Sequence, residues 1–169
     1  MIPAANNIHK QISFTKDYQD IGSQSPQWYN LRKVIASAAA QLPLSSVSVV
    51  VAFDDLELYA DPLLEKVFYT LLENALRHGG TVTSVEFSCE TAGDALKVIC
   101  KDNGGGVPEE FKEAIFQRAY FHHTGFGLYL SRTILGITGI EIRETGLPGK
   151  GARFEITAQA DSFRFTTTG

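Results

Sequence analysis

The sequence predicts a two-layer α/β sandwich, in which helices cover one face of a sheet. Two patterns alternate along the 169 residues. Segments with apolar residues three or four positions apart indicate helices, and short apolar runs with period-two alternation indicate strands. The length fits one domain, and an apolar content of 44% is enough for a buried core.

Four segments have the periodicity or the boundary residues of helices. The first ends before Pro43, because proline cannot continue a helix. The second begins at Asp61 and Pro62, a capping side chain followed by proline at the first helical position, and it continues to His78. The expected helices are residues 30–42, 62–78, 108–117 and 125–137.

Six short segments read as strands. The run from Val47 to Phe53 has apolar residues on both faces, as in a buried strand. Two segments flank the turn residues 91–94 and should pair as a hairpin. The expected strands are residues 47–53, 57–59, 82–90, 95–101, 140–144 and 152–158.

The two ends of the chain lack the alternating helix and strand patterns of the segment between them. Residues 1–14 carry apolar residues at helical spacing and resemble the last turns of a longer helix. Residues 15–25 read as a linker with turn residues, and 161–169 as a tail. The compact domain is therefore expected to span residues 26–160.

Composition excludes several functions. A net charge of −4 with scattered Lys and Arg gives no basis for binding nucleic acid or an anionic membrane. The sequence contains no 18-residue apolar run and no signal-peptide pattern at its start, so we expect a soluble, cytoplasmic domain. Cys89 and Cys100 fall in adjacent expected strands, and we expect small buried thiols in a reducing compartment.

Three polar residues follow one edge of the helix that ends at His78. Asn74 and Arg77 lie at helical spacing from Thr70 and share its stripe with His78. An amide oxygen there can serve as one of the few protein ligands of a nucleotide-bound Mg²⁺, and a guanidinium can meet phosphate. His78 can stack on a base. The same residues also fit the polar stripe of an ordinary amphipathic helix.

Glycine-rich loops supply the other candidate groups. Asp102 ends a strand and is followed closely by three glycines, which let a flat ligand approach the backbone. Its carboxylate can accept a hydrogen bond from the exocyclic amine of adenine. A solvated turn explains the same residues. The pair Gly125 and Gly127 opens a helix whose N-terminus can hold phosphate, although helix packing is equally consistent. His122 and His123 are adjacent and therefore poorly placed to share a metal ion.

Together these elements resemble the catalytic and ATP-binding domain of sensor histidine kinases, over about residues 25–160. That domain belongs to a wider ATPase family that includes gyrase, the ninety-kilodalton heat-shock chaperone and the mismatch-repair ATPases. The resemblance implies the Bergerat ATP-binding fold, a mixed sheet with three main helices on one face. It also implies ATP and Mg²⁺ as ligands.

The resemblance further implies a role for each matching residue. Asn74 would bind Mg²⁺, Arg77 would contact phosphate, and Asp102 would accept the adenine amine. Apart from the resemblance, Glu73 lies next to Asn74 and can assist removal of a proton from an attacking imidazole, although an ordinary surface position on the helix fits it at least as well. The remaining residues expected around the nucleotide are His78, Gly104, Gly106, Ile115, Phe116, Arg118, Thr124, Gly125, Gly127, Leu128 and Gly151.

The sequence departs from the family pattern in places. Thr70 replaces an asparagine of the kinases and a glutamate with which the gyrase-like members activate water, so a hydrolytic motor is disfavoured. His123 replaces a glycine, and the segment between Phe116 and Gly125 is short. The short segment and the phrase at residues 11–22 resemble archaeal kinases, particularly those of methanogens.

The resemblance implies partners that the chain itself lacks. His9 is followed by lysine and is a poor phosphoacceptor, so the acceptor is expected on separate dimerisation helices, with a response regulator downstream. A monomeric fragment that does not phosphorylate itself is therefore expected, although the parent kinase can be membrane-anchored. Two alternatives stay open: a serine kinase of the anti-sigma type, and a noncatalytic interaction module of the same fold.

Overall fold

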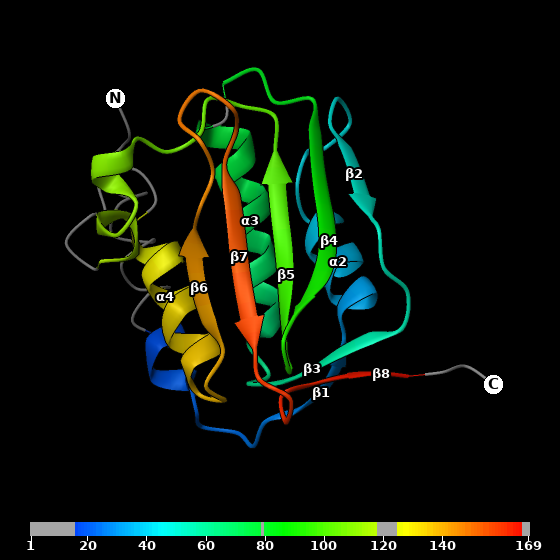
Figure 1. The fold of residues 1–169 in the computed structure, drawn as a ribbon. Helices are drawn as coiled ribbons and strands as arrows, with labels where there is room; N and C mark the ends of the chain where they lie inside the picture. Colours follow the sequence, from blue (N-terminus) through cyan, green and yellow to red (C-terminus); the bar gives the residue numbers. More distant parts are fainter. Residues whose placement is uncertain (1–15, 79, 118–124, 167–169) are drawn as a thin grey trace.

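A computed structural model describes residues 16–78, 80–117 and 125–166. Three helices, α2 (Leu31–Ala39), α3 (Leu64–His78) and α4 (Gly125–Gly136), cover one face of a five-stranded sheet (Figure 1). The two-layer sandwich expected from the sequence is thus confirmed. None of the helices in the described ranges is long and apolar enough to cross a membrane.

The main sheet is mixed, with strand order β2-β4-β5-β7-β6. Strand β2 is parallel to β4, and the other neighbours are antiparallel. The strands are β2 (Ser48–Val51), β4 (Ser84–Ala92), β5 (Ala95–Asp102), β6 (Glu141–Glu144) and β7 (Arg153–Ala158). Each matches an expected strand to within a few residues.

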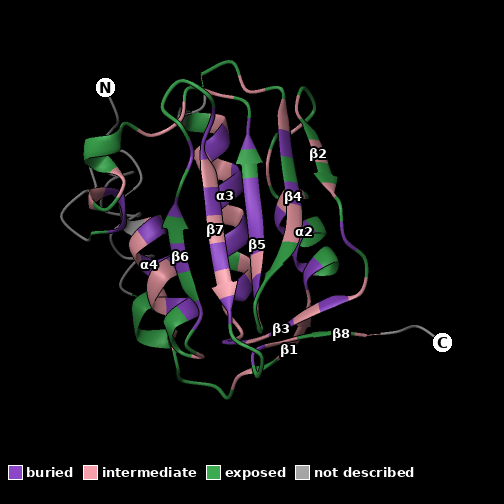
Figure 2. Ribbon diagram, in the orientation of Figure 1, coloured by how far each residue is buried: buried purple, intermediate pink, exposed green. Residues whose placement is uncertain are grey.

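Alternation along the strands builds the core between the two layers. In β7, buried and partly exposed residues alternate throughout, so that one face meets the helices (Figure 2). The apolar stripe expected on α3 is buried as predicted: Leu64, Val67, Phe68, Leu71, Leu72 and Ala75 are at most 3% exposed. This burial leaves the polar stripe of α3 at the edge of the core.

The two cysteines lie on adjacent strands but are not cross-strand partners. Cys89 is opposite Val98 and Cys100 is opposite Phe87, and both thiols are free. Burial raises the pKa of the Cys100 thiol, and the nearby charge of Asp102 raises it further. Cys100 is therefore the buried thiol that was expected, whereas Cys89 is only partly buried.

A second, three-stranded sheet was not expected. It has the order β1-β3-β8, with β1 (Gln27–Asn30), β3 (Leu56–Ala60) and β8 (Phe163–Phe165). Strand β8 lies in the segment expected to be a tail, and it pairs with β3. Three- and four-residue strands give little periodic signal, which explains why the sequence pattern missed β1 and β8.

The helix expected at residues 108–117 is wrong. Two short 3₁₀ turns replace it, η1 (Glu109–Phe111) and η2 (Ala114–Phe116). Their backbone bonds run three residues back, as from Phe116 N to Glu113 O at 3.2 Å. Ten residues form a marginal helix alone. Here burial of Ile115 and Phe116, and an ion pair of Lys112, fix the segment instead.

Candidate functional site

Four segments that the sequence singled out meet at one end of the main sheet. They are the C-terminal part of α3, the loop after β5, the N-terminus of α4, and the loop between β6 and β7 (Figure 1). The two loops touch directly, since Gly149 N donates to Gly105 O at 2.8 Å. The small sheet lies at the opposite end.

Asn74 presents an unused acceptor at this end. Its side-chain oxygen Oδ1 is buried and accepts no hydrogen bond from the residues that the structure describes. A buried amide oxygen without a partner loses the free energy of its hydration, typically 1–3 kcal/mol. Such an orphan acceptor is suited to a ligand that brings a donor or a cation.

Charged and polar groups of α3 surround Asn74. Arg77 forms an ion pair with Glu73, at 3.8 Å between Nη2 and Oε2. Burial raises the pKa of Tyr69, and the adjacent charge and hydrogen bond of Glu73 raise it further. A carboxylate, a phenol and a guanidinium therefore lie on one side of this helix.

Asp102 is fixed rigidly at the end of β5. It is 8% exposed, and its Oδ1 accepts hydrogen bonds from Gly104 N at 2.9 Å and Ala152 N at 3.0 Å. Within the described ranges, no hydrogen bond engages its other oxygen, Oδ2. The carboxylate is therefore oriented by the backbone and retains acceptor capacity.

Gly151 lies against the backbone of Asp102. Its φ is +97°, and a Cβ there would come within 2.0 Å of the Asp102 carbonyl oxygen. Gly106, with φ of +77°, approaches the carbonyl oxygen of Gly151 in turn. No side chain fits between these two loops, so the glycines create a flat backbone floor beside the carboxylate.

The first turn of α4 packs on α3. A Cβ at Gly127 would lie 2.9 Å from Cγ2 of Thr70. The carbonyl of Gly127 accepts the Ser131 hydroxyl at 2.8 Å. This glycine therefore brings the N-terminus of α4 close to the polar stripe of α3.

A family model described as "Histidine kinase-, DNA gyrase B-, and HSP90-like ATPase" matches residues 60–162. This stretch is more than half of the chain and contains Asn74, Asp102, Gly127 and Gly151. The chain belongs to this ATPase family.

Curated members of the family with similar sequences are sensor kinases. The sensor protein KdpD of Escherichia coli is 30% identical over 142 residues, covering 78% of this chain and 16% of KdpD. The alginate biosynthesis sensor protein KinB of Pseudomonas aeruginosa is 29% identical over 143 residues, covering 82% of this chain and 23% of KinB. The chain thus spans less than a quarter of either relative. Both are bacterial, and they give no support to the archaeal resemblance.

Solved structures of the same family share the fold. The catalytic domain of histidine kinase ThkA matches with a TM-score of 0.65 at 21% identity, covering 81% of this chain and 98% of that domain. The mycobacterial sensor histidine kinase MprB matches with a TM-score of 0.70 at 16% identity, covering 83% and 99%. Sequence and fold together identify a catalytic, ATP-binding domain of the sensor histidine kinase type.

Three residues expected at the nucleotide are core residues of this ATPase domain. Ile115, Phe116 and Leu128 are at most 6% exposed. The Phe116 ring meets Phe154 edge-on, and the guanidinium of Arg132 lies 4.2 Å above its centre. These side chains fix the segment before residue 118 and the start of α4.

Several expected residues cannot be compared with the geometry. Arg118, His122, His123 and Thr124 lie outside the described residues, as does the helical stub at 1–14. For His78 and Gly125 the structure describes the backbone alone, at the end of α3 and the start of α4.

Asn103, which was not expected at the site from the sequence, holds the loop after β5 in place by hydrogen bonds. Its Oδ1 accepts from Thr83 N at 3.0 Å and Ser84 N at 3.2 Å, and its Nδ2 donates to the Thr83 hydroxyl at 2.7 Å. An asparagine beside a glycine run is a signal for such a turn. Lys112 and Glu144 were not expected either, and they have no local sequence signal.

Proposed function

We propose that this chain binds Mg-ATP and transfers the γ-phosphoryl group to a histidine on a separate helical dimerisation domain, as the kinase step of two-component signalling. The observation that supports this most is the Asp102 carboxylate, which two backbone N–H groups hold beside Gly151. Membership of the ATPase family supplies the class of ligand.

Asp102 is the proposed adenine reader. Its Oδ2 can accept a hydrogen bond from the exocyclic amine of adenine, and Gly104 N holds the carboxylate in place while Gly106 lets the loop after β5 pack against the backbone of Gly151. Guanine carries a carbonyl oxygen at the same position, which a carboxylate cannot bind. The proposed site therefore selects adenine over guanine.

Asn74 is the proposed protein ligand of Mg²⁺. Its buried Oδ1 has no hydrogen-bond partner in the described part of the chain, and Mg²⁺ on nucleotide phosphates takes one or two protein oxygens and keeps several waters. Within the described residues, no group of three or more His, Cys, Asp or Glu forms a metal site of its own. Bound there, the ion would neutralise charge on the phosphates.

The triphosphate is proposed to lie across α3 and the start of α4. The backbone N–H groups of a helix N-terminus favour anions, and Gly125 and Gly127 begin α4. Arg77 on α3, together with Arg118 and Thr124 beyond the described residues, is proposed to contact phosphate oxygens. His78 is proposed to contact the base.

The proposed chemistry requires mainly positioning and charge neutralisation. A lone pair of the neutral acceptor imidazole forms the N–P bond, the bond from γ-phosphorus to the bridging oxygen breaks, and ADP leaves with that electron pair. The proton on the other ring nitrogen is then lost, and Glu73 is its proposed acceptor. Arg77 and Asn74 act on the phosphate side of the reaction.

Residues outside the domain complete the proposed system. Residues 1–14 are proposed to be the end of a dimerisation helix and residues 15–25 a linker, of which 16–20 are helical. The catalytic domain, expected at 26–160, is proposed to continue through β8, which pairs with β3. ThkA has been solved in complex with the response regulator TrrA, and we propose a response regulator as the downstream partner here as well. The domain is proposed to be cytoplasmic, and monomeric without the helices.

Calorimetric titration tests the proposal. ADP and a non-hydrolysable ATP analogue are titrated with and without Mg²⁺ into the chain and into Asp102→Asn. Loss of one charged hydrogen bond should weaken binding roughly tenfold to hundredfold. Asp94→Asn, at an exposed turn between β4 and β5, removes the same charge and should leave binding unchanged.

Absence of adenine-nucleotide binding by the parent chain would overturn the proposal and favour a noncatalytic interaction module. If binding depends on Asp102, phosphoryl transfer is measured next with candidate helical domains. Transfer to a serine-bearing partner in place of a histidine would favour the serine-kinase alternative.

A further inference from the structure

Glu144 is a buried carboxylate with every oxygen engaged. It ends β6, and its side chain is 0% exposed. Oε1 accepts from Gly146 N at 3.1 Å and from the Lys112 ammonium, and Oε2 accepts from Arg153 N at 3.0 Å. A buried carboxylate is stable only with such a complete set of partners. Glu144 thereby sets the shape of the loop between β6 and β7.

Lys112 joins this loop to a segment far away in sequence. Its side chain is 15% exposed, and its ammonium donates to Glu144 and to Gly146 O at 2.7 Å. The next residue, Glu113, pairs with Arg132 of α4, which also donates to Ile142 O at 3.2 Å. Residues 112 and 113 are therefore attached to both β6 and α4.

A series of close contacts leads from Glu144 to Asp102. A Cβ on Gly146 would lie 2.9 Å from Glu144 Oε2 and 2.6 Å from the carbonyl oxygen of Gly151. Gly151 in turn lies against the Asp102 carbonyl. Two glycine backbones thus separate the buried carboxylate from the proposed adenine reader.

We infer that Lys112 and Glu144 are positioning residues for the nucleotide site. Their ion pair holds the β6–β7 loop against the loop after β5, and so fixes the place of the Asp102 carboxylate. The inference rests on the proposed function of Asp102 and deepens it. Neither residue is among those proposed to contact the nucleotide.

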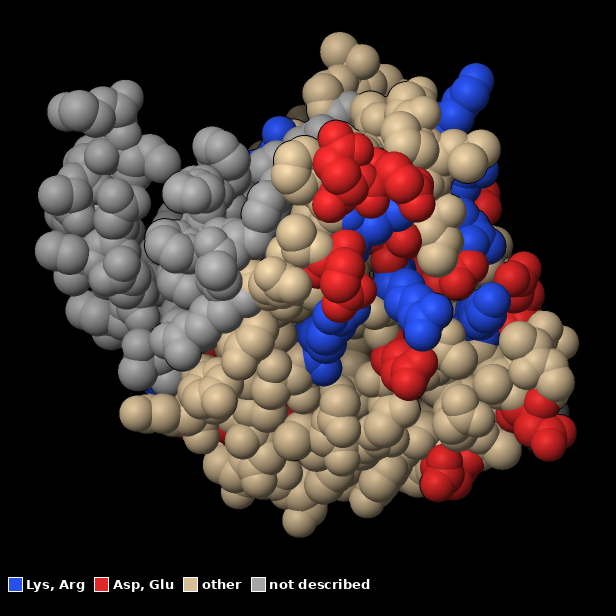
Figure 3. Space-filling view, turned by 60° about the vertical axis from the view of Figure 1, so that its left-hand side comes forward, with Lys and Arg blue, Asp and Glu red and all other residues tan. Residues whose placement is uncertain are grey.

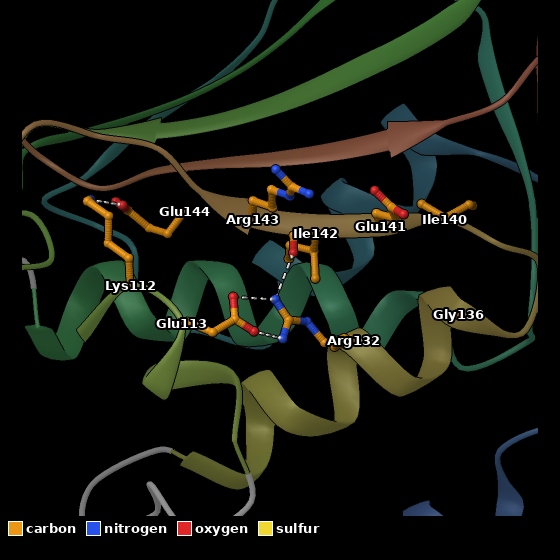
Figure 4. A pocket seen from close by; sticks show the side chains of 9 residues that line it. All are labelled: Lys112, Glu113, Arg132, Gly136, Ile140, Glu141, Ile142, Arg143 and Glu144. Atoms are coloured by element: carbon orange, nitrogen blue, oxygen red, sulfur yellow. Dashed lines mark hydrogen bonds and ion pairs between the residues drawn. The ribbon is translucent and has the colours of Figure 1, made fainter. Parts of the chain in front are cut away.

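A groove beside the pair is lined by charged side chains of β6, α4 and residues 112–113. Its volume is about 520 Å³, and its lining includes both members of each ion pair, Lys112–Glu144 and Glu113–Arg132 (Figure 4). Acidic and basic side chains are interspersed on this face (Figure 3). Four of the six charged side chains of the groove form these two ion pairs, which join β6, α4 and residues 112–113, whereas Glu141 and Arg143 form no ion pair among the described residues.

Two variants test the inference, Lys112→Met and Glu144→Gln, each measured by calorimetry with ADP and GDP. Partners that orient a binding group contribute about 10–100-fold in metal sites, and we expect roughly tenfold weaker ADP binding. GDP binding does not use the Asp102 acceptor, so the ADP-to-GDP affinity ratio should fall by the same factor. The ratio of ADP affinities with and without Mg²⁺ should not change, because Asn74 is undisturbed.

Three controls separate positioning from general stability. Lys112→Arg keeps a charged donor and should restore most of the ADP-to-GDP ratio. Lys97→Met removes a lysine that pairs with Glu155 on the open face of the sheet, and should leave both affinities unchanged. If Lys112→Met does not fold, Lys112→Gln is measured in its place, since it keeps an uncharged donor.

The possible outcomes distinguish the positioning role of Lys112 and Glu144 from the proposed nucleotide binding itself. If the parent binds ADP and Asp102→Asn weakens binding, but the Lys112 and Glu144 variants keep the parent ratio, the positioning role is wrong and the site stands. If the parent does not bind ADP, both are overturned. A reduced ratio in both variants, with rescue by arginine, supports the inference.

Discussion

At the scale of single residues, Gly151 is restricted twice, by conformation and by space. Its φ of +97° is unfavourable for any residue with a Cβ, and the Asp102 carbonyl occupies the place where that atom would lie. Gly149, two residues earlier, has a φ of +83° and open space around it. A substitution at Gly149 therefore introduces backbone strain alone, whereas one at Gly151 adds a steric clash.

Gly149→Ala and Gly151→Ala should differ in both stability and binding. Gly149→Ala should cost about 1–2 kcal/mol, the usual penalty of a left-handed conformation. Gly151→Ala must also displace the loop after β5, so it should cost more and reduce ADP affinity at least tenfold. Urea denaturation and calorimetry measure the two effects. Equal losses in both variants would show that the close approach to Asp102 has no influence.

The residues of the candidate site differ in how far the sequence predicted them. Asn74 and Asp102 stand next to strong local patterns, a helical apolar stripe and a strand followed by glycines, and both lie where the pattern placed them. Lys112 and Glu144 meet across 32 positions of sequence. No local pattern encodes that contact, because the chain path between them is a product of the whole fold.

At the scale of elements, α3 depends on the residue that precedes it. Asp61 is 1% exposed, and its Oδ1 accepts from Leu63 N at 2.9 Å while its Oδ2 accepts from Gly22 N at 2.8 Å. One carboxylate thus satisfies a donor at the helix start and another in the incoming segment. The capping role follows from the sequence, and the bond to Gly22 does not.

Asp61→Ala should therefore destabilise the domain more than a simple cap removal. We expect a loss of about 2–4 kcal/mol in the free energy of unfolding, since two part-buried hydrogen bonds to a charged carboxylate are lost. Asn30→Ala is the matched control: Asn30 caps α2 through one bond to Lys33 N at 3.1 Å, and its loss should cost about 1 kcal/mol. Denaturant titration of both variants measures the difference. A smaller loss for Asp61→Ala than for Asn30→Ala would contradict the double role.

Element boundaries were predicted well where periodicity is long and poorly where tertiary contacts decide. The 15 residues of α3 carry several helical repeats, and the expected stripe is the buried one. Residues 108–117 have good helix formers, yet the burial of Ile115 and Phe116 and the ion pair of Lys112 fix two 3₁₀ turns. Local propensity is a weak prior against such contacts.

At the scale of the whole molecule, the small sheet joins the two ends of the described chain. Strand β8 pairs with β3 through Leu58 and Phe163, and Arg164 contacts both Glu57 and the Trp28 ring of β1. A strand near residue 165 thus stabilises strands formed before residue 61. The expected tail contributes to the fold.

Removal of residues 161–169 should lower the melting temperature by roughly 5–10 °C, because the buried edge of β3 loses its strand partner and its apolar cover. Removal of residues 167–169 alone keeps β8 and should have no effect. Thermal unfolding followed by circular dichroism compares the two truncations. An unchanged melting temperature after the longer truncation would show that β8 contributes nothing to stability.

The small sheet also affects how the domain responds to a mechanical load. The incoming strand β1 and the outgoing strand β8 flank β3, at the end of the main sheet away from the loops around Asp102 (Figure 1). A mechanical load applied after β8 is therefore borne by the hydrogen bonds of this sheet, whereas a load applied before residue 16 first meets the contacts of Asp17 with Lys66 of α3 and of Tyr18 with Tyr129 of α4. Tension from the outgoing end therefore acts away from the nucleotide end, while tension from the incoming end reaches α4, whose N-terminus belongs to the proposed site.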